Sequence, residues 1–434
     1  MSGVLTLLRG DRALPSMLRS IGVQGLIILM NVATGIITAR LLGAEGRGVY
    51  AAITLWPPLL AMLATAGLSS AVTVCVRRAP GDAGDIVGAA LLLGFGYALL
   101  ATLAGQWMLP RFLSHYDTDT LWLARLCLAA VTVNGVQIVM RQYFAGRGQY
   151  LKCNLMHLLP QLLHLVLLLF ALLLGLTAGV AAVALFLGGA LAVLAMLPGF
   201  LASARPTFAG ALVRLRSLQS FSLRAAPGGV VNAFSLYADR LVLLPLLPAA
   251  DLGLYAVAYS FSRLIQFIQP ALQSIFLSHL SGQDAASGKH AHDHAVRFLL
   301  VALVAGCVVL WLVGEWLLTF MYGHAFIAAV GAFRILVIEA SLGVLSQVTL
   351  QLYLASDRPG FASVVQGATL VVSVVLLLAL VPAHGGEGAA MALAVASGLR
   401  WLALLFALRP VLGLAAPRML LNRADWRYLL SRMR

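Results

Sequence analysis

The sequence has little charge for its length, and this scarcity excludes an ordinary water-soluble protein. Of its 434 residues only 10% are charged, whereas soluble domains carry about a quarter. Hydrophobic residues make up 61% of the chain, and the mean hydropathy is +0.96. Hydrophilic segments are short, so the sequence also lacks room for a separate catalytic domain. The composition predicts a polytopic membrane protein.

Two further absences narrow the function. The cysteines have no paired spacing, which argues against a disulfide framework or a metal site; they are Cys75, Cys127, Cys153 and Cys307. His290, His292 and His294 alternate in a polar loop and are interpreted as solvated rather than metal-binding. The apolar run before Arg9 is too short for a cleavable signal, and the first long apolar segment has the length of a membrane span.

The apolar runs predict an all-α protein with about twelve transmembrane helices. The expected ranges are 17–39, 49–75, 86–109, 121–144, 153–175, 180–203, 221–246, 252–279, 297–320, 326–354, 361–382 and 386–408. With the N-terminus inside, 21 Lys and Arg residues lie on the inner side, three on the outer side and five within spans. This asymmetry predicts two cytoplasmic termini, with the basic tail near anionic headgroups. The net charge of +14 is therefore attributed to topology and not to a nucleic-acid partner.

The chain also repeats itself at an offset of 205 to 210 residues. Gly48 and Tyr50 are matched by Gly253 and Tyr255. Further matches join Tyr143-Phe144-Ala145 to Tyr353-Leu354-Ala355, and Val180-Ala181-Ala182 to Gly388-Ala389-Ala390. The echoes predict a duplicated six-span unit, with an N-terminal bundle in 1–210 and a C-terminal bundle in 211–434. Because each unit has an even number of spans, the two bundles are expected to have the same orientation, with the substrate between them.

Charged residues inside the spans are the candidates for function, because each costs roughly 2.5–3.5 kcal/mol at the middle of a span. The candidates are Arg125, Asp239, Arg240, Arg263, Arg334, Glu339 and Arg400. Five arginines and two carboxylates predict a cationic lumen for an anionic substrate. Because the planar guanidinium suits phosphate, a phosphate or pyrophosphate group is favoured.

Polar side chains on the eighth span share one helical face with an arginine. Tyr259, Arg263, Gln266, Gln269 and Gln273 follow at steps of three or four residues. We expect this face to line the lumen, with Tyr259, Gln266 and Gln273 as further substrate-binding residues; the alternative is interhelical hydrogen bonding. A milder stripe on the first span leaves the two interpretations equal.

The two carboxylates within spans have no suitable partner on their own helices. Asp239 and Arg240 are neighbours that point about 100° apart, and Glu339 is five positions from Arg334. We therefore expect each to find a partner on another helix. Asp239 and Glu339 are candidate gating or coupling residues, and a purely structural ion pair is the alternative. His157 and His164, seven residues apart on the fifth span, are interpreted as packed core histidines.

Several segments resemble the oligosaccharide flippases, the polysaccharide transporters related to O-antigen translocases and MATE exporters in the MOP superfamily. The resembling segments are Ala39-Arg40-Leu41-Leu42-Gly43-Ala44-Glu45-Gly46-Arg47-Gly48, Tyr237-Ala238-Asp239-Arg240-Leu241, Leu252-Gly253-Leu254-Tyr255-Ala256-Val257-Ala258-Tyr259-Ser260, Arg334-Ile335-Leu336, Tyr353-Leu354-Ala355-Ser356-Asp357-Arg358-Pro359 and Gly385-Gly386-Glu387-Gly388-Ala389-Ala390. They keep the family's order over nearly the whole chain.

The resemblance implies a V-shaped, MATE-like pair of six-helix bundles in the bacterial inner membrane. It also implies alternating access that moves a polyprenyl-pyrophosphate-linked glycan to the periplasmic leaflet, for a surface polysaccharide such as the O-antigen of lipopolysaccharide. Membrane lipids, a polysaccharide polymerase and glycosyltransferases are then the expected partners. No cofactor is expected, and coupling to protons or sodium is left open.

Three rival functions remain. One is a non-transporting membrane scaffold, which would leave the arginines within the spans unexplained. A MATE-type cation-coupled antiporter is disfavoured because every acid of the first half lies in a tail or loop, whereas an exporter of organic cations would place carboxylates inside the bundle. A membrane enzyme, such as a polymerase or ligase, would need a long periplasmic loop, and the expected outer loops are short.

Overall fold

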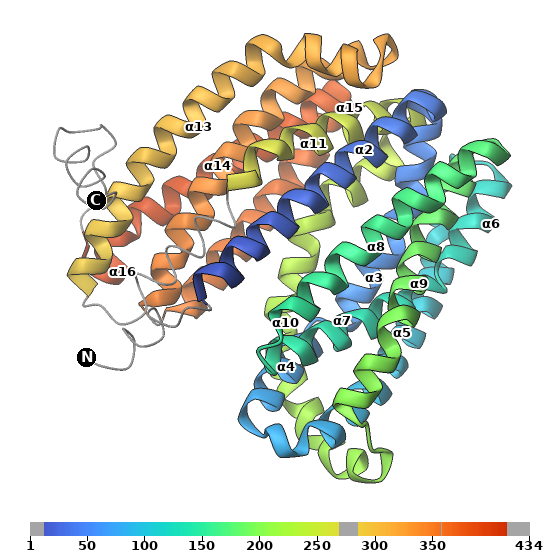
Figure 1. Ribbon diagram of the computed structural model, residues 1–434. Coiled ribbons are helices and arrows are strands. Elements are labelled where there is room, and N and C mark those ends of the chain that lie inside the picture. Colours follow the sequence, from blue (N-terminus) through green and yellow to red (C-terminus); the bar gives the residue numbers. More distant parts are fainter. Residues whose placement is uncertain (1–12, 269–284, 357, 415–434) are drawn as a thin grey trace. The chain divides into compact units, whose positions relative to one another are not determined.

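The computed structural model describes residues 13–268, 285–356 and 358–414, and in this part of the chain every regular element is a helix. The all-α prediction is therefore confirmed for the described residues. Contacts divide the chain into two compact units, one of residues 14–257 and one of residues from 258 onward. Figure 1 shows the helices of each unit along the chain.

The unit of residues 14–257 contains the first half of the helices. They are α2 (Ala13–Thr54), α3 (Trp56–Ala64), α4 (Leu68–Arg78), η1 (Pro80–Asp82), α5 (Ala83–Phe112), α6 (Thr118–Cys127), α7 (Ala130–Gly146), α8 (Tyr150–Ala171), η2 (Leu172–Leu174), α9 (Ala178–Ala204), α10 (Phe208–Leu246) and the start of α11 (Ala249–Ser262). Helices α4, α5 and α7 pack on one another, and α10 packs along α3, α4 and α5.

The unit from residue 258 onward contains the end of α11 and the remaining described helices. They are η3 (Arg263–Ile268), α13 (Ala285–Tyr322), η4 (His324–Ala329), α14 (Val330–Ala355), α15 (Pro359–Phe406) and α16 (Leu408–Leu412). Helix α14 is central to this unit, because it packs on α13, α15 and η3.

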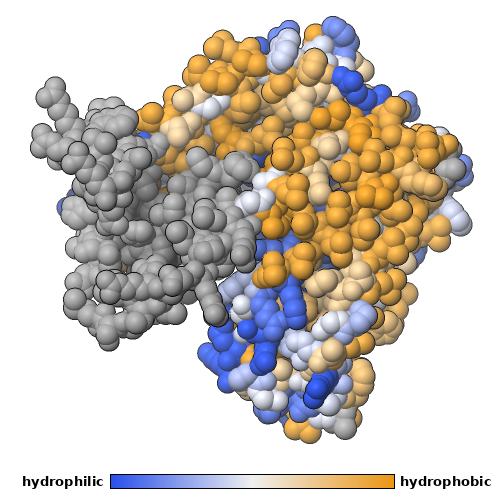
Figure 2. All heavy atoms as spheres, in the orientation of Figure 1, coloured by the Kyte–Doolittle hydropathy of each residue, from blue (hydrophilic) through white to orange (hydrophobic). Residues whose placement is uncertain are grey.

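Nine helices in the described part are long and apolar enough to cross a membrane. Their outward faces carry large apolar side chains, among them Phe95, Trp107, Leu312 and Phe406. Figure 2 shows apolar residues over most of the visible surface, with hydrophilic residues gathered near helix ends at the top and bottom of the view. Such a surface is stable only against lipid. The protein is a multi-pass membrane protein, as its composition predicts.

Two of the nine apolar helices contain a sharp break at a glycine. Gly43 inside α2 has φ of +68°, and Gly385 inside α15 has φ of +56°. Side chains other than glycine adopt this left-handed region at a cost, so each glycine marks a point where two helices join. Both breaks fall between spans expected from the sequence. The number twelve stays a prediction, because the expected span 252–279 runs beyond the described residues.

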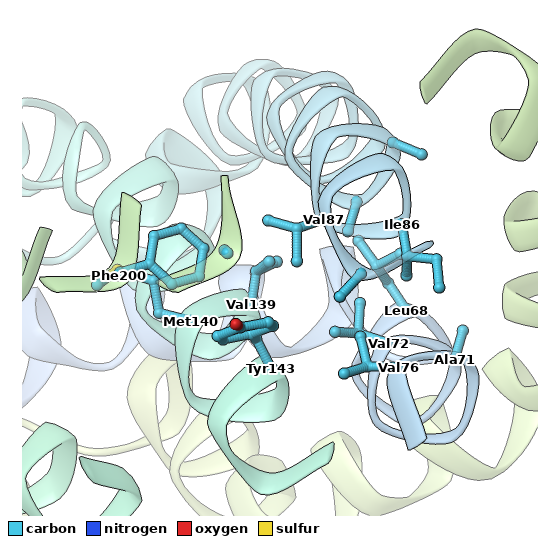
Figure 3. Close-up of a cluster of buried hydrophobic side chains, with 14 of the residues drawn as sticks. Leu68, Ala71, Val72, Val76, Ile86, Val87, Val139, Met140, Tyr143 and Phe200 are labelled. Carbon is cyan, nitrogen blue, oxygen red and sulfur yellow. The ribbon is translucent and has the colours of Figure 1, made fainter. Parts of the chain in front are cut away.

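The core of the first unit is a continuous apolar cluster between α4, α5, α7, the C-terminal end of α9 and the N-terminal end of α10. Figure 3 shows Leu68, Val72 and Val76 of α4 beside Ile86 and Val87 of α5. Tyr143, Phe144 and Phe200 add aromatic packing, with ring centroids 5.4 to 6.0 Å apart in edge-on arrangements.

The second unit has a separate core around α14. Phe261 and Phe333 have ring centroids 5.2 Å apart, and Tyr322 lies 5.8 Å from Phe261. Farther along α14, the Tyr353 hydroxyl donates to the Leu404 carbonyl of α15 at 2.5 Å. The hydrogen bond satisfies a polar group in a fully buried position, which hydrocarbon surroundings require.

The two repeated segments that contain Gly48 and Gly253 contact each other in the first unit. A Cβ added at Gly48 would lie 1.7 Å from the Ala249 carbonyl oxygen, and one at Gly253 would lie 1.9 Å from the Ala44 carbonyl oxygen. Ala44 and Ala249 are themselves 205 residues apart. Each half of the contact is therefore the repeat of the other half, as in a self-complementary twofold interface. This contact supports the duplication that the sequence echoes predict.

The boundary between the two units falls after Val257. The start of α11 belongs to the first unit because it contacts the Ala44–Gly48 segment and because α10, which precedes it, packs within that unit. The predicted bundle boundary between 210 and 211 concerns sequence repetition, which this grouping does not test. That boundary stays a prediction.

The contact between the two repeated segments predicts that Gly48→Ala lowers the stability of the protein. A methyl group there must displace backbone, and overpacking costs about 1–3 kcal/mol or more. Thermal unfolding of the purified protein in detergent should show a lower midpoint for this variant. The matched control is Gly189→Ala in α9, where an added Cβ meets nothing within 4 Å. Equal midpoints for the two variants would show that this contact does not constrain the fold.

Candidate functional site

Two predicted residues of the eighth span, Tyr259 and Arg263, meet at the junction of α11 and η3. The guanidinium carbon of Arg263 lies 4.0 Å from the centroid of the Tyr259 ring, which is a cation–π contact. Arg263 Nη2 lies 2.8 Å from Glu339 Oε2 on α14. The expectation that Glu339 has its partner on another helix is confirmed.

Glu339 is held by a second contact. Its side chain is nearly fully buried, and the Ser397 hydroxyl of α15 donates to Oε1 at 3.1 Å. Oε1 thus accepts a hydrogen bond, while Oε2 faces Arg263 as an ion pair without hydrogen-bond geometry. A carboxylate that is so enclosed is stable as an anion only because it has partners of this kind.

Gln266 and Arg400 both lie close to Gly343, which is on the same helix, α14, as Glu339. A Cβ added at Gly343 of α14 would lie 3.7 Å from Gln266 Nε2 and 3.9 Å from Arg400 Nη2. The missing side chain at residue 343 thus leaves both polar groups close to α14. Arg400 Nε is buried without a hydrogen-bond partner. We call Tyr259, Arg263, Gln266, Glu339, Ser397 and Arg400 the arginine cluster; it has two guanidinium groups and one carboxylate.

The other predicted residues of the second unit do not join this cluster. Arg334 Nη2 lies 3.5 Å from Glu315 Oε2 of α13, and its guanidinium carbon lies 5.5 Å from the Trp311 ring centroid. Its partner is therefore on another helix, as expected. Gln269 and Gln273 lie outside the residues whose side chains the structure describes, so their predicted substrate contacts stay predictions.

The predicted residues of the first unit occupy separate positions. Asp239 is buried, and its Oδ2 accepts a hydrogen bond of 2.9 Å from the Tyr255 hydroxyl. Arg240 lies over Tyr237, with 5.9 Å between the guanidinium carbon and the ring centroid. Arg125 is exposed on the short helix α6. A role for these residues in binding or gating stays a prediction.

A polar cavity of about 550 Å³ lies within the first unit. Its wall is built by α3, α4, α7 and α10 together with the residues that join α3 to α4. The lining residues are Pro58, Ala61, Met62, Thr65, Ala66, Ser69, Ser70, Asn134, Gln137, Ile138, Arg141, Gln142, Gly228, Gly229, Asn232 and Tyr237. The volume falls in the range of roughly 300–1,000 Å³ that is typical of ligand pockets. We refer to it as the polar cavity.

Several polar groups of the lining are fixed by neighbouring helices. The Gln137 side chain donates to the Met156 carbonyl of α8 at 2.9 Å, and the Thr73 hydroxyl donates to Gln142 Oε1 at 2.9 Å. At Gly229 an added Cβ would lie 2.3 Å from the Ala66 carbonyl oxygen, so helix α10 approaches the segment between α3 and α4 closely beside the cavity. These contacts shape the wall before any ligand binds.

The cavity lining contains amides, hydroxyls and one guanidinium, but no carboxylate. Amides and hydroxyls both donate and accept hydrogen bonds, so they suit a ligand that carries many hydroxyl groups. The lining has no anionic group that would attract an organic cation. The cavity can therefore hold a neutral or anionic polar molecule.

The sequence predictions missed this cavity, although a signal was present. Asn134, Gln137 and Arg141 follow at steps of three and four residues, and Thr65 and Ser69 are four residues apart on the preceding segment. The predicted contacts were formal charges in the middle of spans, whereas Arg141 is one of the 21 basic residues expected on the inner side. The structure places the Arg141 side chain in the cavity wall.

Metal and disulfide chemistry find no support in the described residues. No group of three His, Cys, Asp or Glu side chains is close enough there to hold a metal ion. Cys75, Cys127, Cys153 and Cys307 are free thiols in the structure. His290, His292 and His294 have side chains outside the described part, so their interpretation as solvated residues is not tested.

Comparison with solved structures identifies the fold. The fold matches the lipid II flippase MurJ in an inward closed conformation, with a TM-score of 0.76, 12% identity and coverage of 90% of this chain and 87% of that chain. It matches an inward-facing multidrug resistance MATE family transporter of the MOP superfamily with a TM-score of 0.71, 16% identity and coverage of 90% and 96%. A MOP superfamily transporter from Pyrococcus furiosus gives 0.60, 17% identity and coverage of 94% and 98%. The chain has the MOP superfamily fold.

The family model for polysaccharide biosynthesis proteins matches residues 37–331, which is more than half of the chain. The protein belongs to this polysaccharide biosynthesis family. No curated protein matches the chain. The family match and the shared fold confirm the resemblance to polysaccharide transporters of the MOP superfamily.

The arginine cluster predicts that Glu339→Ala is strongly destabilising. Removing one partner of a buried ion pair leaves the other charge uncompensated, at a cost of about 3–5 kcal/mol. Thermal unfolding in detergent should show a large drop for Glu339→Ala, and part of it should return in the double variant Arg263→Met, Glu339→Ala. Glu315→Ala is the control, because its more exposed pair with Arg334 is worth about 0–1 kcal/mol. A drop no larger than that of the control would contradict a structural ion pair.

Proposed function

We propose that this protein is a flippase that moves a polyprenyl-pyrophosphate-linked oligosaccharide across the bacterial inner membrane for surface polysaccharide biosynthesis. The proposal rests on one observation above the others, which is the polar cavity without a carboxylate in a member of the polysaccharide biosynthesis family. In this proposal the protein performs no catalysis of its own.

The chemistry of the cavity favours a glycan over a cationic drug. Sugar hydroxyls can exchange hydrogen bonds with the side chains of Asn134, Gln142 and Asn232, while Tyr237 offers an aromatic surface. An exporter of organic cations is instead expected to have a carboxylate in this position. One structural neighbour is described as having a binding pocket of reverse polarity that suggests a different function within the superfamily. That description is consistent with a change of substrate by pocket charge on a common fold.

The arginine cluster is the proposed site for the pyrophosphate. Its two guanidinium groups exceed its one carboxylate, and a guanidinium presents paired donors that match phosphate oxygens. Arg400 has a buried Nε without a hydrogen-bond partner, so a ligand oxygen could satisfy it. Tyr259 and Gln266 would bind the adjoining sugar. Arg125, Arg240, Arg334 and Gln273 are retained as further proposed contacts along the lumen.

Gating and coupling are assigned to the two buried carboxylates. Glu339 is paired with Arg263, and Asp239 accepts a hydrogen bond from Tyr255. Protonation or sodium binding at either carboxylate would weaken its contact and so connect an ion gradient to a change between states. Both termini are proposed to face the cytoplasm, where a glycosyltransferase supplies the lipid-linked glycan. A polysaccharide polymerase would receive it on the other side.

The proposal is tested by measuring flipping directly. The purified protein is reconstituted into liposomes with a polyprenyl-pyrophosphate-linked oligosaccharide in both leaflets, and a glycosidase added outside digests the accessible sugar. We expect nearly complete digestion with the protein and about half without it. Half digestion in both cases would contradict the proposal, and proton-driven export of ethidium by the same vesicles would support the antiporter.

Arg400→Gln tests the proposed pyrophosphate contact. Losing a charge-assisted hydrogen bond of about 1.5–3 kcal/mol should slow flipping by roughly tenfold or more. The matched control is Arg111→Gln, because Arg111 is exposed at the end of α5 against Trp107 and lies in neither proposed site. Equal flipping rates for Arg400→Gln and the wild type, at equal protein content, would remove the arginine cluster from the substrate path.

A further inference from the structure

Among the described residues that line the polar cavity, Arg141 alone has a side chain with a formal charge. It belongs to α7, where Asn134 and Gln137 precede it at steps of three and four residues and also line the cavity. The cavity thus presents a single guanidinium beside two amide groups. The inference drawn from this arrangement rests on the proposed function, because it specifies which glycan the cavity takes.

The hydrogen bond that Arg141 makes leaves its charge uncompensated. Arg141 Nη1 and His157 Nε2 of α8 are 2.9 Å apart. A guanidinium has donors and no acceptor, so His157 Nε2 must accept this bond and carries no proton. The imidazole is then neutral, with its proton on Nδ1. No carboxylate in the described part of the chain lies within ion-pair distance of Arg141.

An arginine in this state is suited to bind an anion from a ligand. The fork of the guanidinium has five N–H donors, and the bond to His157 uses only one of them. The bond also restrains the long side chain, so less conformational entropy is lost when a ligand binds. A carboxylate can accept two parallel hydrogen bonds from such a fork.

The number of guanidinium groups distinguishes a sugar carboxylate from a pyrophosphate. One guanidinium backed by a neutral imidazole matches a single carboxylate, and the amides and hydroxyls around it match sugar hydroxyls. A pyrophosphate has two phosphate groups and is better matched by the two guanidinium groups of the arginine cluster, although Glu339 offsets one of their charges.

We propose that the polar cavity selects a glycan with an acidic sugar, whose carboxylate binds Arg141 while Asn134 and Gln137 contact the neighbouring hydroxyls. His157 is a positioning residue that orients the guanidinium. The selected substrate class is therefore a hexuronate-containing oligosaccharide, carried on the lipid whose pyrophosphate binds elsewhere in the protein.

The test measures binding to the full-length protein in lipid nanodiscs by isothermal titration calorimetry. Three probes are compared: a disaccharide ending in glucuronate, the same disaccharide ending in glucose, and inorganic pyrophosphate. We expect the wild type to prefer the glucuronate probe by about tenfold or more, a ratio that corresponds to about 1.4 kcal/mol. Arg141→Gln should abolish the preference and leave the affinity for the glucose probe and for pyrophosphate unchanged.

Two further variants control for fold and for charge. Arg141→Lys keeps the charge but lacks the planar fork, so it should retain only part of the preference. Arg147→Gln removes an exposed arginine at the C-terminal end of the same helix and should behave like the wild type. Thermal unfolding midpoints are measured for all variants. If Arg141→Gln does not fold, the result for Arg141→Lys decides, because full retention of the preference would overturn the proposal.

Three outcomes would overturn the inference: no preference for glucuronate in the wild type, an unchanged preference in Arg141→Gln, or a loss of pyrophosphate affinity in place of glucuronate affinity. The last outcome would assign Arg141 to the carrier lipid. Failure of the proposed function gives a different result, because the wild type would then move no lipid-linked glycan in the liposome assay, whatever its affinity for the disaccharides.

Discussion

Charges within the hydrocarbon region must be paired or must reach water, and this constraint organises the polar interior of the protein. Each charge at the middle of a span costs a few kcal/mol unless it finds a partner. Glu339 meets the constraint with Arg263 as an ion pair at one oxygen and Ser397 as a hydrogen-bond donor to the other. Asp239 meets it with the Tyr255 hydroxyl. Arg141 lines the polar cavity and has a neutral histidine as its partner, and this incomplete compensation is the reason for proposing it as a binding group.

The same constraint explains which parts of the molecule the sequence could predict. Span length and hydropathy identify the helices because lipid excludes every spanning structure except helices and closed barrels. The breaks at Gly43 and Gly385 fall where short polar segments separate two apolar runs. The repeat of Gly48 at Gly253 also predicted a duplication, and the structure gives it a physical reason, since each glycine makes room for the carbonyl group of the other segment.

The partners of individual charges were less predictable. Helical spacing correctly excluded a bond between Glu339 and Arg334 within α14, and it correctly placed Tyr259 beside Arg263. It could not identify Arg263 as the partner of Glu339, because contacts between helices depend on packing that one sequence does not reveal. The polar cavity was not predicted from the sequence for another reason. The polar groups of its wall are nearly all uncharged amides and hydroxyls. In a membrane protein such groups also serve as ordinary contacts between helices, so their spacing alone does not distinguish a ligand wall from a packed interface.

A transporter must release its substrate, and the proposed sites are suited to reversible binding. In the arginine cluster an incoming pyrophosphate has to compete with Glu339 for Arg263, so part of the attraction between ligand and arginine is offset by the ion pair that is given up. In the polar cavity a sugar carboxylate meets one guanidinium, which already donates one hydrogen bond to His157. Two strong, uncompensated cationic sites would hold the anion too tightly for turnover, since transport requires binding that is favourable enough for entry and weak enough for exit. Modest affinity at each proposed site is therefore compatible with turnover.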